Sequence, residues 1–163
     1  MSGIIGQGGS KSGIIQTYDV PAQIPAFNGI LNNLTNFAVS THHNLISTER
    51  FDVLGNFDGT TFTAPVSGLY QFNATLVLGS VVIASGEYFR YRIITSNKTY
   101  DPLFDPRAFD AVPGHWALSH SVLADMDEGD TATFSIYTNN SSATADILGT
   151  ETGWSGFLVQ ETL

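Results

Sequence analysis

The sequence predicts an all-β protein, an antiparallel sandwich of about nine or ten short strands preceded by an extended arm. Runs in which apolar and polar residues alternate with period two recur along the chain, and turn residues separate them. No stretch shows a convincing helical pattern. The chain also has 16 glycines among 163 residues, which suits a turn-rich β protein.

Composition excludes several classes of function. The net charge is −9, from 15 acidic and 6 basic residues, and phosphate backbones are bound through Lys and Arg, so nucleic acid is a poor partner. The chain has no cysteine, which removes disulfides, thiolate metal ligands and cysteine nucleophiles. No run reaches membrane-spanning length and no signal peptide is visible, so we expect no membrane insertion.

The stretch from Phe51 to Leu78 is the most informative part of the sequence. Phe51–Leu54 and Thr60–Ala64 are predicted short strands, separated by residues that tolerate turn conformations. Gly68–Leu78 is a longer run with strict alternation, which predicts a strand with one buried face and one wetter face. The predicted buried side chains of this run are Tyr70, Phe72, Ala74, Leu76 and Leu78.

This stretch resembles the globular head of the complement C-one-q family, whose jelly roll is shared with tumour necrosis factor. The family typically shows a Phe-Thr-x-Pro-x-x-Gly-x-Tyr-x-Phe block, and Phe62–Phe72 matches it. Glu128–Asp130 before a strand and Trp154–Leu158 near the end of the chain agree in order and spacing. The resemblance covers roughly residues 35–163. It implies a jelly-roll head that packs as a homotrimer around a threefold axis.

Residues 1–34 are predicted to form an extended N-terminal arm and linker. The arm begins with Ser-Gly-Ile-Ile and repeats it at Ser12, and Gly-rich sequence of this kind builds no core and is normally a flexible tail. The isoleucine pairs instead suggest attachment, as extended strands added along a neighbouring chain. The predicted assembly residues are Ile4, Ile5, Ile14 and Ile15. The arm also resembles N-terminal segments common on phage structural proteins, which implies a virion protein.

Further strands of the head are predicted downstream of the arm. They lie at Thr35–Ser40, Glu87–Thr95, Trp116–Asp125, Thr131–Tyr137, Asp146–Leu148 and Trp154–Glu161, and Gly79–Ser85 either extends the central strand or forms an edge. Arg90 and Arg92 face away from the core in this pattern. They form either a basic spot for an anionic ligand or ion pairs with acids across a subunit contact, and the second interpretation is favoured.

The segment Ser96–His115 is predicted to be a long irregular loop, because three prolines exclude regular ladder pairing through it. Aromatic side chains lie among charged ones in it, a composition that contact surfaces favour. The candidate binding residues are Tyr100, Asp101, Phe104, Arg107 and Phe109. A ligand-binding loop and a loop packed into a subunit interface are equally supported.

Catalytic and metal-binding patterns are weak. The acid cluster Asp125–Asp130 offers carboxylates to a calcium ion, but an ordinary turn before a strand is favoured. His42 and His43 are adjacent, so on a strand they point to opposite faces and cannot share a metal ion. Gly153–Phe157 lacks the second glycine of a nucleophile elbow. We therefore predict no catalytic residues, no metal site and no cofactor.

The sequence thus leads to a non-enzymatic phage virion protein as the first hypothesis. It would be a trimeric fibre, spike or tail-associated knob, attached to other virion proteins by its arm. Its head would bind a host-surface glycan or protein receptor, or decorate the shell. The alternative is a secreted ligand or lectin-like protein, which the lack of a signal peptide and of a collagen Gly-X-Y run disfavours. A glycan-degrading tail enzyme is a third, less favoured class.

Overall fold

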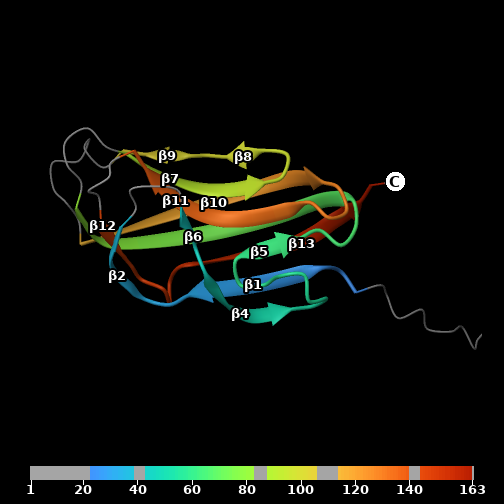
Figure 1. Ribbon diagram of the computed structural model, residues 1–163, viewed down its shortest axis with the longest axis horizontal. Coiled ribbons are helices and arrows are strands. Elements are labelled where there is room, and N and C mark those ends of the chain that lie inside the picture. Colours follow the sequence, from blue (N-terminus) through green and yellow to red (C-terminus); the bar gives the residue numbers. More distant parts are fainter. Residues whose placement is uncertain (1–22, 39–42, 83–87, 106–113, 140–143, 163) are drawn as a thin grey trace, which may run out of the picture.

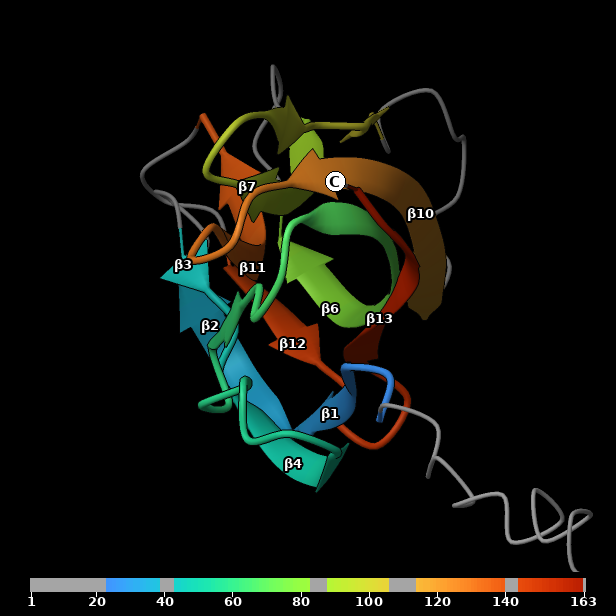
Figure 2. The ribbon, with the colours of Figure 1, turned by 90° about the vertical axis from the view of Figure 1, so that its right-hand side faces the viewer.

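The structure, a computed structural model, describes residues 23–38, 43–82, 88–105, 114–139 and 144–162. These residues form thirteen strands in two antiparallel sheets, and none of them lies in a helix. The predicted antiparallel β-sandwich is therefore confirmed. The two sheets face each other, with β10, β13 and β1 along one side and β3, β11 and β7 along the other in the end-on view (Figure 2).

The larger sheet, called sheet A, is built around the long central strand β6 (Figure 1). Its order is β2 (Leu34–Ala38), β12 (Thr144–Ile147), β6 (Gly68–Val82), β13 (Gly153–Glu161), β1 (Ala26–Leu31) and β4 (Ser47–Asp52), with β10 (His115–Met126) also paired to β6. β12 pairs with the C-terminal part of β6 and β13 with its N-terminal part. β10 pairs along β6 from Gly68 to Gly79 and occupies its other edge.

The smaller sheet, called sheet B, is ordered around β11 and β7. It consists of β3 (His43–Asn44), β11 (Thr131–Thr138), β7 (Phe89–Thr95) and β8 (Thr99–Tyr100), with β5 (Thr61–Thr63) paired to β11 and β9 (Leu103–Phe104) paired to β7. Every pairing is antiparallel.

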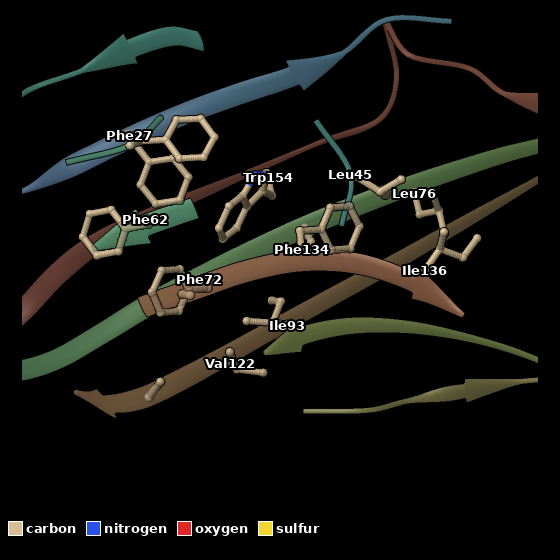
Figure 3. Packing of buried hydrophobic residues seen from close by; sticks show 14 of the residues in the cluster. Phe27, Leu45, Phe62, Phe72, Leu76, Ile93, Val122, Phe134, Ile136 and Trp154 are labelled. Atoms are coloured by element: carbon tan, nitrogen blue, oxygen red, sulfur yellow. The ribbon is translucent and has the colours of Figure 1, made fainter. Parts of the chain in front are cut away.

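The core between the sheets is largely aromatic (Figure 3). All five predicted buried side chains of β6 are at most 4% exposed, which confirms the alternation expected from the sequence. The ring of Phe27 lies 5.0 Å from that of Phe62 and 4.7 Å from that of Trp154. Sheet B contributes Phe134, Ile93 and Ile136 from the opposite side. Burial of this apolar surface is the main source of the stability of the fold.

The Phe62–Phe72 block ties the start of β6 to its neighbours. The Tyr70 hydroxyl donates a hydrogen bond to the Val66 carbonyl at 2.8 Å, which closes the turn before the strand. A Cβ on Gly68 would lie 2.5 Å from the Gln160 carbonyl oxygen, so only glycine permits this approach of β6 to β13. The Ser67 hydroxyl accepts the Glu128 amide at 3.0 Å and so fixes the turn before β11.

The predicted boundary between arm and head is displaced in the structure. Ala26–Leu31 was expected to be linker, yet it forms β1 between β13 and β4. Phe27 and Leu31 are fully buried, so this segment contributes to the core of the head. The alternation was hard to recognise because a glycine, Gly29, occupies an inward position and an isoleucine, Ile30, an outward one. The isoleucine pairs of the arm lie outside the described residues.

Two other predicted strands are shifted. The strand expected at Phe51–Leu54 is instead Ser47–Asp52, and Phe51 is 51% exposed on an edge strand. The bend at 53–55 includes Gly55, whose φ of +71° favours glycine. The first head strand expected at Thr35–Ser40 corresponds to β2, which ends at Ala38, and residues 39–42 lie outside the described ranges.

Candidate functional site

The predicted irregular loop folds back onto sheet B. Thr99–Tyr100 and Leu103–Phe104 pair with β7, so the expectation that prolines exclude ladder pairing from this segment was wrong. Pro102 lies between the two short strands, where the ladder is interrupted and its missing N–H is not needed. Arg107 and Phe109, two of the candidate binding residues, lie outside the described residues.

Asp101, which lies between β8 and β9, binds both arginines of β7 and so holds this edge against that strand. Arg90 Nη1 donates to Asp101 Oδ2 at 2.6 Å, and Arg92 Nε donates to Oδ1 at 2.8 Å. Both arginines therefore pair with an acid, as the favoured interpretation predicts, but this acid belongs to the same chain rather than to another subunit. The Arg92 guanidinium also lies 4.3 Å from the ring centre of Tyr137. A basic spot open to an anion is not what these arginines form, because Asp101 already occupies both of them.

Tyr100 and Phe104 lie at the seam where the edge of sheet B meets β10. The Tyr100 hydroxyl donates to the Leu123 carbonyl at 3.5 Å, and the Lys98 ammonium lies 5.0 Å from the Tyr100 ring centre. The Phe104 ring lies 4.8 Å from the Trp116 ring. The described part of the predicted binding loop therefore holds the two sheets together at this edge. Ligand binding by this loop stays a prediction.

His120 lies in the same seam. Its ring packs edge-on against Tyr91, with centroids 5.9 Å apart. Burial lowers the pKa of His120, and a hydrogen bond to the Tyr100 backbone opposes this shift in part. His120 Nε2 is buried without a hydrogen-bond partner among the described residues. The side chain is therefore a neutral part of the seam at neutral pH.

The acid cluster before β11 forms a hydrogen-bonded turn. Asp130 accepts from the Asn97 amide at 2.7 Å and from the Asp127 backbone N–H at 2.9 Å. Gly129 adopts a φ of +88°, a conformation in which a side chain is strained. This is the ordinary turn that the favoured interpretation predicts. Within the described ranges, no group of three histidine or acidic side chains is placed to hold a metal ion.

The outer face of sheet A, turned away from the core, is a surface that the sequence analysis missed. Strand register places Gln71 directly between Leu123 of β10 and Phe157 of β13, and Ala26 of β1 follows Phe157. We call these four residues the apolar row. Leu123 is 51% exposed and Phe157 41%, and Val159, further along β13, is 53% exposed. Single exposed apolar side chains are common, but a contiguous group of them marks an interaction surface.

A second line of residues lies beside the apolar row. Asn73 of β6 pairs with Ser121 of β10 and Ser155 of β13, and Ser155 pairs with Asn28 of β1. We call these four the polar row. A hollow of about 250 Å³ adjoins it, lined by Asn28, Asn73, Thr75, Ser155 and the segment 150–152.

Neither row contains a charged residue, although the chain has a net charge of −9. Depletion of charge together with exposed aromatic and aliphatic side chains is typical of the buried centre of a protein interface. The sequence carried a signal for this surface. The outward positions of β6 from Leu69 to Val77, which alternate with the core residues, are all uncharged. That signal becomes a surface only when register places the strands side by side.

Comparison with known proteins supports the fold. No protein-family model matches the chain and no curated protein matches it. Among solved structures, the globular domain of zebrafish complement 1qA protein matches with a TM-score of 0.58 and 14% identity, covering 85% of this chain and 99% of that domain. Murine APRIL in a crystal at pH 8.5 matches with a TM-score of 0.55 and 7% identity, covering 84% of this chain and 100% of that one. The fold is therefore the jelly roll that the sequence resemblance implies.

One further finding concerns membranes. The part of the chain that the structure describes contains no helix of the length and hydrophobicity that a membrane span requires.

Proposed function

We propose that this protein is a non-enzymatic, homotrimeric binding head whose subunits join through the outer face of sheet A. The observation that carries this proposal is the pair of uncharged rows on this face, with Leu123 and Phe157 exposed in the apolar row. Copies that each carry a charge of −9 repel one another across most of their surface. Contact through the two uncharged rows avoids placing like charges opposite each other and buries apolar area.

Threefold assembly requires a second surface, because cyclic contacts between three copies join two different patches. The edge formed by β9 and β10 supplies a candidate. Leu103 of β9 is 49% exposed, and the ring of the next residue, Phe104, lies 4.8 Å from that of Trp116 on β10. In our proposal the edge of one copy packs against the sheet A face of the next copy. The third such contact closes the ring, and the sheet A faces of the three copies meet at the threefold axis.

The site of action follows from the arm. Its resemblance to phage leader segments supports a virion protein whose residues Ile4, Ile5, Ile14 and Ile15 attach it to another particle protein. The head then faces outward, to bind a host-surface receptor or to decorate the shell. A secreted ligand is the second candidate. The specific observation that favours it is the structural similarity to the complement globular domain and to APRIL.

Sedimentation equilibrium of the full chain over a wide concentration range tests the assembly. We expect one species with three times the chain mass of 17.5 kDa. A monomer at every concentration would contradict the proposal.

Deleting residues 1–17 separates the two candidate sites of action. A virion protein lacking these residues still forms trimers but no longer enters particles when it is supplied to an infected host. Normal incorporation would refute the anchoring role. Incubation of the head with host-surface glycans, followed by assays of binding and of product release, distinguishes an adhesin from a glycan-degrading enzyme.

A further inference from the structure

We propose that Gln71, Asn73 and Ser121 form a polar layer that fixes the register of the three copies, a role that rests on the proposed assembly through sheet A. All three lie on the outer face of that sheet. Gln71 belongs to the apolar row and the other two to the polar row, so the layer lies where the two rows meet. The partner that recognises it is a second copy of the same chain.

The three side chains already bind one another within a copy. Gln71 Nε2 donates to the Ser121 hydroxyl at 2.8 Å, and the Ser121 hydroxyl donates to Asn73 Oδ1 at 2.9 Å. Gln71 Nε2 also reaches the Phe72 carbonyl at 3.0 Å. The amide of Gln71 is therefore drawn toward the polar row, which leaves its apolar stem between Leu123 and Phe157.

Two hydrogen-bonding groups of this cluster remain unused. An amide side chain offers two donors and one acceptor oxygen. Among the described residues, neither Asn73 Nδ2 nor Gln71 Oε1 takes part in a hydrogen bond. One of these groups is a donor and the other an acceptor, and they lie two residues apart on the same strand. The cluster is therefore complementary to another copy of itself.

Cyclic symmetry turns this complementarity into a closed ring. If Asn73 Nδ2 of one copy donates to Gln71 Oε1 of the next, the same contact repeats three times and no amide group of the layer is left unpaired. In a shifted arrangement the same amides face Leu123 or Phe157 and lose water without gaining a partner. A buried polar residue in an apolar contact selects register in this way in other assemblies.

The test compares Gln71→Leu, Asn73→Leu and the double variant by native mass spectrometry and sedimentation equilibrium. Each single substitution leaves the other amide without its partner, so we expect the half-dissociation concentration of the trimer to rise about tenfold or more. The double variant removes both amides and adds apolar surface. We expect it to associate at least as well as either single variant, but as a mixture of stoichiometries.

Urea unfolding of each variant at a concentration where it is monomeric separates the coupling within a copy from the coupling between copies. The coupling is the difference between the effect of the double variant and the sum of the two single effects. A coupling that appears in trimer dissociation but not in unfolding of the monomer supports the layer. Coupling of equal size in both measurements overturns it, as does a double variant that remains a single trimeric species. Thr133→Leu, on the outer face of β11, is the matched control and is expected to leave affinity and stoichiometry unchanged.

The outcome for the wild-type chain distinguishes failure of the layer from failure of the assembly. A monomeric wild-type chain refutes the proposed trimer and the layer with it. A trimeric wild-type chain whose affinity is within about twofold of both single variants refutes the layer alone.

Discussion

The outer faces of the two sheets differ in how their polar groups are satisfied. On sheet B, Arg90 and Arg92 are bound by Asp101 of the same chain, and Arg92 stacks on Tyr137. On sheet A the exposed face carries no charged residue in either row, and apolar side chains are about half exposed. One face completes its interactions within the chain, whereas the other leaves apolar area and amide groups uncovered.

This difference shows that the position of charge identifies the candidate interface better than hydrophobicity does. Both faces contain large side chains that alternate with core residues. Sheet B uses its aromatics to cover arginines, so they do not form an apolar surface. The two rows of sheet A contain no charges to cover, and their Phe157 and Leu123 remain available to another molecule.

The largest effect is expected from Phe157→Asp, which tests the uncovered outer face of sheet A. It places a carboxylate in the centre of the proposed interface, where contact between copies would remove it from water. We expect the half-dissociation concentration of the trimer to rise at least about a hundredfold, with little change in the unfolding of the monomer. Sedimentation equilibrium measures the first quantity and urea unfolding the second.

Ile46→Asp is the matched control for Phe157→Asp. Ile46 is the more exposed of the two, at 75%, and it lies outside both rows of sheet A. It is expected to leave association unchanged. Equal loss of trimer in both variants would mean that added negative charge, rather than position on sheet A, weakens assembly.

Asp101→Ala tests the outer face of sheet B, whose arginines are bound within the same chain. The substitution leaves two arginines, with side chains 27% and 17% exposed, without their carboxylate partner. We expect the free energy of unfolding to fall by about 2 kcal/mol, since hydrogen bonds to charged groups contribute about 1.5–3 kcal/mol each and the site is partly exposed. The mass of the assembly is expected to stay unchanged, and Glu49→Ala, exposed on β4, to change stability by less than about 0.5 kcal/mol.

The core and its alternation were predictable from the sequence because period two is a local property. Tyr70, Phe72 and Leu76 were assigned to the core from one strand alone, and they are buried. The orientation of Arg90 and Arg92 away from the core was also predictable. Their partner was not, because Asp101 reaches them only through the turn that brings β8 and β9 back onto β7.

The parts that could not be predicted depend on contacts between distant strands. β1 was missed because one of its three inward positions is Gly29, which breaks the expected alternation of apolar and polar residues. The burial of β1 also depends on its pairing with β13, which is far away in the chain. The outer face of sheet A was missed for the same reason. Leu123, Gln71 and Phe157 become neighbours only through the register of β10, β6 and β13. Sequence alone shows which residues point outward, but not which of them lie together.

A change of pH tests the seam that joins the two sheets. Burial lowers the pKa of His120 below its ordinary value of 6.5, so the unfolded chain binds the proton more readily than the folded chain. Its contribution to stability is therefore complete above that value and is lost as the pH falls toward the lowered pKa. We expect urea unfolding to show a loss of stability between about pH 7 and pH 5 that is smaller in His120→Gln. An identical pH dependence in the two proteins would contradict a neutral His120 in the seam.

The dependence of assembly on salt is expected to be the smallest effect, and it distinguishes the two faces without any substitution. An interface that lacks ion pairs loses nothing when charges are screened, whereas repulsion between copies of charge −9 decreases. Raising the salt from about 0.02 M to about 0.5 M is therefore expected to lower the half-dissociation concentration of the trimer, by less than about tenfold. Sedimentation equilibrium in both buffers measures the change. A clear weakening at high salt would mean that charged side chains hold the copies together, and it would move the interface away from the outer face of sheet A.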